Sequence, residues 1–285
     1  MNIGLIGLGL MGGSFGRTLV KKTEHKVYGF DISEQVMQKG EMLNAYHEKL
    51  TKDNANQLDM LILSVYPDYF SQALEEFLPY LKKGAIVSDF SGVKGSIIEK
   101  MQEYRSKYPD LIFIGGHPMA GREFSGIEHS ITTMFDKAFM ILVPINADIF
   151  VLSLVKNFYK ELGFLDVVIT TAENHDEMIA YTSQLCHIVS NAFIKNQTAE
   201  KHLGYSAGSY KDLTRVARLN PQMWSGLMIS NKDKLKKELD EFILNLQKYS
   251  TALENGSREE LEILLAEGNE RKLSIDSRSN KNNGN

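Results

Sequence analysis

Cysteine is nearly missing from this 285-residue chain, since Cys186 is the only one. A single cysteine excludes an intrachain disulfide and a cysteine-rich metal site, and it favours a reducing compartment such as the cytoplasm. A basic excess is missing too, because 32 Lys and Arg stand against 36 Asp and Glu and give a formal net charge of −4. That balance argues against nucleic acid as a partner, because proteins that bind phosphate backbones usually carry a basic surface.

Long apolar runs are also absent. No window reaches the ~20 uninterrupted apolar residues that span a membrane, and the glycine-rich start MNIGLIGLGLMGGSFG lacks the basic region of a secretory signal. We therefore expect no membrane partner and a cytoplasmic location. What the chain does have is an ordinary globular composition, with 43% hydrophobic and 24% charged residues, and a length that suits about two domains.

The first half of the chain alternates short apolar runs with segments long enough for helices. This alternation predicts a mostly parallel, doubly wound sheet with helices on both faces, which is an α/β Rossmann-like domain over residues 1–147. The expected strands are Ile3–Ile6, Lys26–Phe30, Met60–Val65, Ala85–Asp89, Leu111–Ile114 and Phe139–Val143.

From residue 148 onward the pattern is helical, apart from one β-like run at Asp166–Ile169. Glu173–Asn196 predicts one long helix, Glu259–Leu273 a last one, and Lys232–Leu253 carries an apolar stripe at three- and four-residue intervals. We expect this helical domain, over 148–276, to form a homodimer through the stripe, although the stripe can also be buried within one subunit. The polar residues 277–285 predict a disordered tail.

A glycine-rich turn, GLGLMG at residues 7–12, lies between the first expected strand and the first expected helix. There the glycines suit a tight turn, a close approach of a pyrophosphate and close packing of helix on strand. Asp31 ends the next strand about 20 residues further on, where a carboxylate binds the ribose hydroxyls of NAD and repels the 2′-phosphate of NADP. The alternative is a purely structural turn, with Asp31 or Ser33 capping the next helix. The expected NAD-binding residues are Gly7, Gly9, Leu10, Met11, Gly12, Asp31, Ser64 and Val65.

Three segments that follow expected strands carry unusual sequence: Ser64–Pro67, Asp89–Gly95 and Gly115–Gly121. Loops at the carboxyl ends of parallel strands meet at one edge of the sheet, so these should share a crevice with the cofactor. His117 has an ordinary pKa of about 6.5 and can take a proton from a substrate hydroxyl, or it can be a structural histidine bonded to the backbone. Lys94 can bind a carboxylate or lie in solvent at a helix start.

Polar residues also interrupt the predicted long helix. Ser183, Gln184, His187 and Asn191 fall at three- and four-residue spacings and should share one face. Buried polar groups need partners, so these side chains either bond one another or line a cavity.

Two further polar features flank that stripe. The pair His175-Asp176, near the helix start, is interpreted as a capping pair without contact to substrate. Lys211, Arg215 and Arg218 lie in a basic segment, where an arginine can hold a carboxylate through two charge-assisted hydrogen bonds or simply face solvent.

The ordered set GLIGLGLMGGS, DFSGVKG, HPMAGREFSG, ENHDEMIAYTSQLCH and YKDLTRVARLNPQMW resembles the motifs of the prephenate and arogenate dehydrogenase family of tyrosine biosynthesis, over about residues 1–275. The resemblance implies NAD-dependent oxidative decarboxylation of prephenate to 4-hydroxyphenylpyruvate and CO₂. It also implies that His117 takes the proton of the ring hydroxyl, that Arg215 binds a substrate carboxylate and that His187 lines the substrate pocket.

The chain departs from the family's motifs at three points. Gln184 stands where a second histidine is usual, and Ser91-Gly92 reverses a Gly-Ser pair whose serine orients the catalytic histidine, so Ser91 is assigned that role. Arg122 replaces a smaller polar residue, and an added cation favours prephenate, whose side chain has a carboxylate and no amine. Gln184, Arg122 and Lys94 complete the expected substrate-binding set.

Other functions remain open from the sequence. An arogenate or dual-specificity cyclohexadienyl dehydrogenase would use the same motifs. A dehydrogenase of β-hydroxy acids or an imine reductase has the same domain plan but leaves HPMAG without a role. A catalytically silent, NAD-sensing protein is favoured only by Gln184 and Gly92. No metal is expected in any of these.

Overall fold

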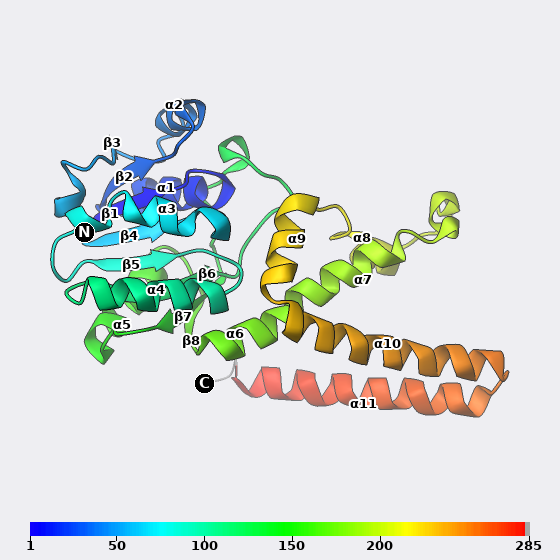
Figure 1. Cartoon of the computed structure of the whole chain (residues 1–285). Coiled ribbons are helices and arrows are strands. Elements are labelled where there is room, and N and C mark those ends of the chain that lie inside the picture. Colours follow the sequence, from blue (N-terminus) through cyan, green and yellow to red (C-terminus); the bar gives the residue numbers. More distant parts are fainter. Residues whose placement is uncertain (283–285) are drawn as a thin grey trace. The chain divides into compact units, whose positions relative to one another are not determined.

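The computed structural model describes the backbone of residues 1–282 and the side chains of residues 1–278. Within this described part, one eight-stranded sheet has the order β3-β2-β1-β4-β5-β6-β7-β8 (Figure 1). All neighbouring strands are parallel except β6 and β7, which confirms the mostly parallel sheet. The strands are β1 Asn2–Ile6, β2 Lys26–Phe30, β3 Glu48–Lys49, β4 Met60–Leu63, β5 Ile86–Asp89, β6 Ile112–Pro118, β7 Phe139–Pro144 and β8 Asp166–Ile169.

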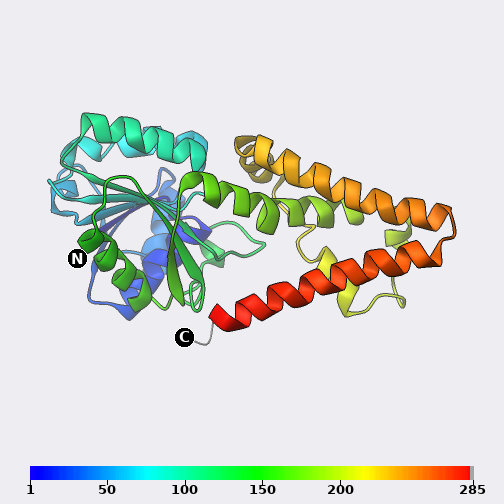
Figure 2. The ribbon, with the colours of Figure 1, turned by 90° about the horizontal axis from the view of Figure 1, so that it is seen from below.

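Helices cover both faces of this sheet (Figure 2). On β4, Met60 and Ile62 belong to the apolar cluster of one face, whereas Leu61 and Leu63 belong to the cluster of the other. This alternation explains why the sequence MLIL is apolar throughout, because a strand buried on both faces has no polar side. The first cluster takes side chains from α1 Leu10–Lys22, α2 Glu34–Met42 and α5 Ile149–Glu161, and the second from α3 Phe70–Glu75 and α4 Gly95–Lys107.

Strand β6 is longer than the sequence indicated. The expected strand ends at Ile114 and a loop begins at Gly115, but β6 continues to Pro118 and pairs His117 with Ile141 of the antiparallel β7. The glycines serve close packing rather than a turn, because a Cβ on Gly116 would lie 2.6 Å from the carbonyl oxygen of Asp89. The expectation of a loop from Gly115 was therefore wrong, and His117 projects from a paired strand.

The helices after β8 also differ in detail from the expected pattern. The long helix is divided into α6 Ala172–Ile179, a π-helical turn Ala180–Leu185 and α7 Cys186–Phe193. A π turn holds an extra residue, so it shifts the faces on which later side chains lie. The remaining elements of this part are α8 Gly208–Thr214, α9 Pro221–Ser230 and short 3₁₀ turns at Ala55–Gln57, Pro67–Tyr69, Leu78–Tyr80, Ile127–His129 and Gln197–Lys201.

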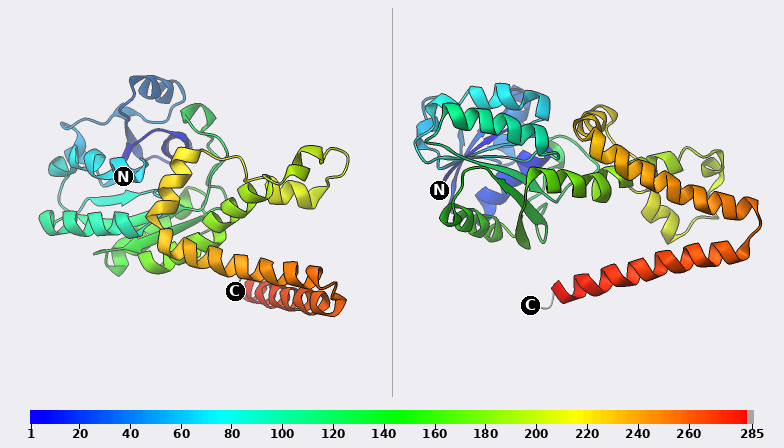
Figure 3. Two further views of the ribbon diagram at one scale, coloured as in Figure 1. Left: turned by 45° about the vertical axis from the view of Figure 1, so that its right-hand side comes forward. Right: turned by 60° about the horizontal axis from the view of Figure 1, so that its bottom comes forward.

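By their internal packing, residues 1–232 and 233–285 form two compact units. In the second unit, α10 Lys232–Glu254 and α11 Arg258–Asn282 run in opposite directions (Figure 3). Their connection passes through Gly256, whose φ of 62° is in the left-handed region that glycine favours, and the Tyr249 hydroxyl donates to the Leu264 carbonyl at 3.3 Å. Several apolar side chains of the pair are exposed in the single chain: Ile243, Leu244, Leu246, Leu253, Ile263, Leu265 and Leu273.

Two expectations about the later part of the chain can be compared with these elements. The polar tail was expected from 277, but residues 277–282 continue α11, and 283–285 lie outside the described residues. The domain division at 147/148 stays a prediction. In the described part, α5 and β8 follow that division and still pack on or pair with the sheet. No described helix is long and apolar enough to cross a membrane.

Candidate active site

The glycine-rich turn after β1 is too tightly packed for side chains at two of its three glycines, and it is open at the third. Gly7 has a φ of 87°, and a Cβ on it would lie 2.4 Å from the Ser64 carbonyl oxygen. A Cβ on Gly12 would lie 1.9 Å from the Gly7 carbonyl oxygen, so α1 approaches the turn as only a glycine allows. Gly9, by contrast, has open space around its Cβ position and begins α1 without a side-chain cap. The free N–H groups of α1 therefore face an open site that suits a phosphate group.

Asp31 stands beside this turn. Its Oδ2 accepts from the Leu8 amide at 2.8 Å and its Oδ1 from the Ser33 amide at 2.9 Å. The Ser33 hydroxyl caps α2 by accepting from the Val36 amide, so the alternative in which Asp31 caps that helix was wrong. Each Asp31 oxygen keeps a lone pair for a hydroxyl donor. Together with Ser64 and Val65, which touch the Gly7 position, these residues fit a dinucleotide with an unphosphorylated ribose.

The β6 strand carries His117 to the same edge of the sheet. Strands β1, β4, β5 and β6 are neighbours and parallel, so Gly7, Ser64, Asp89 and His117 all lie at or just beyond their carboxyl ends. In open α/β sheets this edge is where ligands bind. The placement brings the histidine and the glycine-rich turn to one side of the molecule.

His117 does not stand alone at this edge. Its Nδ1 lies 2.8 Å from Nε2 of His175 in α6, and Nδ1 of His175 lies 2.7 Å from Oδ1 of Asp176. The same carboxylate accepts from the backbone amides of Lys94 at 2.7 Å and Gly95 at 2.8 Å. Asp176 therefore caps α4, a distant helix with no capping side chain of its own.

The pair His175-Asp176 was expected to cap its own helix. Asp176 does cap a helix, but that helix is α4, and Thr171 caps α6. The contact between His175 and His117 was missed. No local pattern reveals it, since 58 residues separate the two rings along the chain. The sequence shows only two adjacent polar residues at the start of an expected helix, and the structure shows that both are almost completely buried.

These contacts set the charges of the group. Burial, with smaller effects from His175 and Lys94, lowers the pKa of His117 well below its ordinary range. Burial acts to raise the pKa of Asp176, but hydrogen bonds from the His175 ring and the amides of Lys94 and Gly95 outweigh it and lower that pKa. At neutral pH the structure thus holds a neutral His117 and an ionised Asp176.

The reversed Ser91-Gly92 pair places a glycine opposite the catalytic candidate. A Cβ on Gly92 would lie 3.9 Å from Nε2 of His117 and 3.7 Å from Cδ2 of Leu227, so position 92 faces the ring. Ser91 is nearly buried, and its amide donates to Asp89 at 2.8 Å. The orienting role of Ser91 stays a prediction.

Lys94 requires a correction. None of its side chain is exposed, and its ammonium donates to Oδ2 of Asp89 at 2.5 Å and to the Gly116 carbonyl at 2.7 Å. Burial lowers the pKa of Lys94, and the Asp89 carboxylate opposes that effect. Neither a substrate carboxylate nor solvent reaches this group, so the expected substrate-binding role was wrong. Lys94 instead joins the end of β5 to β6.

The polar stripe of the second half bonds to backbone. The Gln184 amide donates to the Leu227 carbonyl at 3.0 Å and accepts from the Asn231 side chain at 2.9 Å, and it is 1% exposed. His187 lies 3.1 Å from the Val216 carbonyl, and Asn191 donates to the Ala217 carbonyl at 3.1 Å. These side chains hold the segment that contains α9, which neither alternative anticipated. The substrate-binding role of Gln184 does not fit its burial.

Arg215 lies on the surface near His187. Its side chain is 68% exposed, and its charge, after burial, is a second influence that lowers the pKa of His187. The guanidinium is 3.5 Å from the Glu123 carboxylate, a partner that the sequence did not indicate. Arg122 donates to the His129 carbonyl at 3.0 Å, and its guanidinium lies 5.4 Å from the centre of the Phe124 ring. Both arginines keep further donors for an anion.

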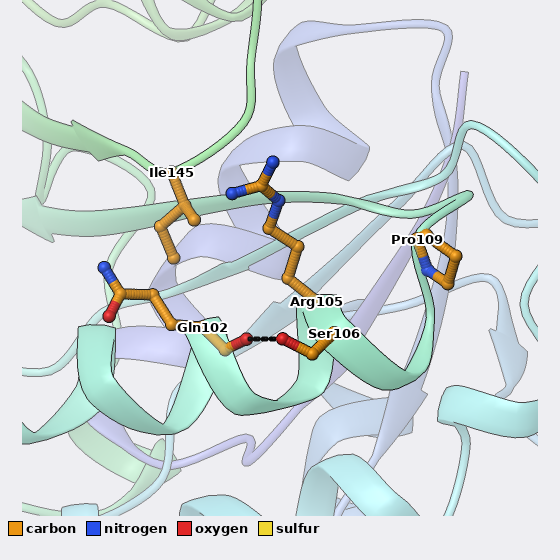
Figure 4. Close-up of a pocket in the computed structure, with 5 residues that line it drawn as sticks. All are labelled: Gln102, Arg105, Ser106, Pro109 and Ile145. Carbon is orange, nitrogen blue, oxygen red and sulfur yellow. Dashed lines mark hydrogen bonds between the residues drawn. The ribbon is translucent and has the colours of Figure 1, made fainter.

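A separate hollow of about 460 Å³ has no relation to these residues. Figure 4 shows Gln102, Arg105 and Ser106 of α4 around it. Its other lining residues are Pro109, which precedes β6, and Ile145, which follows β7, so it lies at the sheet edge opposite to His117. Among the described residues, no group of three or more His, Cys, Asp or Glu is arranged to hold a metal ion.

Comparison with known proteins agrees with this geometry. The family model described as prephenate dehydrogenase, nucleotide-binding domain, matches residues 15–168, and the model described as prephenate dehydrogenase, dimerization domain, matches residues 171–267. The chain is 30% identical over 263 residues to the cyclohexadienyl dehydrogenase of Zymomonas mobilis, covering 88% of each protein.

Two solved structures extend the comparison to the fold. The prephenate dehydrogenase from A. aeolicus in complex with hydroxyphenyl propionate and NAD+ is similar with a TM-score of 0.82 and 29% identity, over 96% of this chain and 98% of that one. The arogenate dehydrogenase of Synechocystis is similar with a TM-score of 0.80 and 26% identity, over 96% and 100%.

Proposed function

The chain belongs to the prephenate dehydrogenase family, and on that premise we propose that it catalyses the NAD-dependent oxidative decarboxylation of prephenate to 4-hydroxyphenylpyruvate and CO₂ in tyrosine biosynthesis. The observation that carries the proposal is the placement of His117. Its Nδ1 is held by His175, and its Nε2 faces the glycine at position 92 at the cofactor edge of the sheet. A neutral imidazole in that place can accept a proton from a ring hydroxyl.

In this proposal, cofactor binding, substrate binding and proton removal fall to different residues. The turn at Gly7–Gly12 and α1 hold the pyrophosphate, and Asp31 binds the ribose hydroxyls. NAD held by these residues would supply the acceptor for the hydride that leaves C4 of the substrate. Arg215 binds a substrate carboxylate, and Nε2 of His117 takes the proton of the C4 hydroxyl. Because loss of CO₂ makes the ring aromatic, the protein mainly has to orient the substrate and remove one proton.

The two arginines assigned to substrate binding, Arg122 and Arg215, favour prephenate over arogenate as the substrate. Arg122 and Arg215 each keep guanidinium donors that are not used by the protein. The side chain of arogenate carries an ammonium group, which a second arginine repels. The side chain of prephenate carries a carboxylate and no amine. A silent NAD-sensing protein is not favoured, because His117 and Arg215 are both present.

The activity itself can be tested directly. Purified protein with NAD is expected to form NADH when prephenate is added, with a higher kcat/KM than with arogenate. Replacing NAD by NADP should lower kcat/KM strongly, because Asp31 repels the 2′-phosphate. Absence of NADH formation with both substrates would contradict the proposal, and equal kcat/KM values would assign the chain to the dual-specificity enzymes.

Arg215→Ala is expected to raise KM for prephenate by about 10- to 100-fold with a much smaller change in kcat. The reason is that a charge-assisted hydrogen bond to the carboxylate is lost before and during the reaction alike. Steady-state kinetics on the variant gives both constants. Arg105→Ala is the matched control, since that arginine lines the hollow at the opposite sheet edge. An unchanged KM in the Arg215 variant would remove Arg215 from the site.

We also propose that the protein is a homodimer in the cytoplasm. The match to a dimerization domain and the exposed apolar side chains of α10 and α11 support the dimer. The single cysteine supports a reducing compartment.

A further inference from the structure

We propose that His175 and Asp176 are positioning residues that hold the His117 imidazole in the tautomer with hydrogen on Nδ1 and a bare Nε2. The inference deepens the proposed function and rests on it for its catalytic meaning. The bond lengths along the chain of groups are 2.8 Å from His117 to His175 and 2.7 Å from His175 to Asp176.

The direction of these bonds follows from counting protons. An ionised carboxylate can only accept, so Nδ1 of His175 must carry the hydrogen that Oδ1 of Asp176 receives. In the tautomer that carries its hydrogen on Nδ1, His175 presents a lone pair at Nε2. Only one hydrogen fits between this nitrogen and Nδ1 of His117, so it belongs to His117. The ring of His117 is therefore left with an unprotonated Nε2, which is the atom that a base needs.

The pair His175 and Asp176, called the dyad below, is held in place by more than one element, as a positioning role requires. Asp176 accepts from the first two amides of α4. Its own carbonyl accepts from the side chain of Asn231 at 2.8 Å, and Asn231 is tied in turn to Gln184. The His175 side chain has no exposed surface. Burial and these bonds restrict rotation of the His175 ring away from His117.

The opposite side of the His117 ring shows why this control is needed. Position 92 faces Nε2, and as a glycine it offers no side chain that could orient the imidazole. The bond at Nδ1 to His175 is therefore a contact that can orient the ring from its other side. When Nε2 accepts a proton, the new positive charge lies one ring away from the Asp176 carboxylate, which stabilises it.

The test reads the tautomer and the kinetics separately. The protein is labelled with ¹⁵N-histidine, and the His117 signals are assigned by comparison with His117→Gln. In the absence of substrate, the unchanged protein should show hydrogen on Nδ1 and a bare Nε2. His175→Phe should shift the hydrogen toward Nε2, whereas His175→Gln, whose side-chain oxygen can still accept, should retain the original tautomer. His202→Gln is the matched control, because His202 bonds Ser206 instead.

In steady-state kinetics, His175→Phe should lower kcat by about 10- to 100-fold. The KM values should change by less than about threefold, and His175→Gln should recover most of the lost kcat. Hydrogen on Nε2 in the unchanged protein, or an unaltered tautomer in His175→Phe, would overturn the proposal. If His175→Phe does not fold, the tautomer of the unchanged protein and of His175→Gln decides the question.

The two proposals fail in different ways. A protein with the expected tautomer but without NADH formation from prephenate retains the positioning dyad and loses the proposed reaction. A protein that turns over prephenate while Nε2 carries the hydrogen retains the reaction and loses the dyad.

Discussion

His117→Asn is expected to lower kcat by about 10²-fold or more while NAD still binds, because asparagine keeps a polar side chain on β6 but cannot take a proton. The effect should fall on kcat rather than on KM for NAD, since the glycine-rich turn and Asp31 are untouched. Stopped-flow or steady-state NADH formation gives kcat, and NAD titration followed by protein fluorescence gives the affinity. Near-normal turnover would remove His117 from the chemistry.

The pH profile of the unchanged protein provides a second measurement on the same residue. Burial lowers the pKa of His117 below about 6.5, so the neutral, basic form persists on the acid side of that value. Activity that needs neutral His117 is then present above the lowered pKa and is lost as pH falls through it. We expect kcat/KM to stay level through pH 6.5 and to decline only in more acidic buffer, and His117→Asn should lack this decline. His47→Asn, on the exposed surface, is the control.

Lys94→Met is expected to lower the free energy of unfolding at pH 7 by about 3–5 kcal/mol, the usual cost of removing one partner of a buried ion pair. The Asp89 carboxyl would lose its partner in a position with no exposed surface, and the Gly116 carbonyl would lose its side-chain donor. Methionine has a similar length, so the cost reflects charge more than volume. Urea denaturation gives the free energy directly.

The chain offers a matched control for this substitution. Lys83 also pairs with an aspartate, Asp110, at 2.9 Å, but 85% of its side chain is exposed. Lys83→Met should leave the free energy of unfolding nearly unchanged, because water screens exposed pairs. The double variant Asp89→Asn, Lys94→Met should recover part of the loss, since no unpaired charge remains. A Lys94 variant as stable as the Lys83 variant would contradict the account of this pair.

The cofactor site was the part of this molecule most open to prediction from sequence. The glycines at 7, 9 and 12 and the acid at 31 act within one β-α-β unit, so spacing along the chain maps directly to distance in space. The structure agrees with this placement, because Asp31 accepts from the Leu8 amide beside the turn and Ser33 caps α2.

The substrate side was predicted less well for a physical reason. A pair of glycines is compatible with a turn and with a closely packed strand. Gly115 and Gly116 belong to a strand because they pair with β7, which the local sequence does not reveal. Lys94 is buried because its ammonium bonds Asp89 at the end of β5 and the Gly116 carbonyl of β6. These groups surround it only in the folded chain. The pairing of His175 with His117 joins elements that only the tertiary fold brings together.

Helix α4 is capped by a side chain of another helix, and this affects which parts of the chain can unfold separately. The first turn of α4 is completed by a carboxylate that lies 82 residues further along, at the beginning of α6. The amino ends of the two helices are thus fastened by one side chain, so fraying of either end exposes the other. Because Asp176 also bonds the His175 ring that contacts His117, we expect the amides of Lys94 and Gly95 to exchange slowly with solvent.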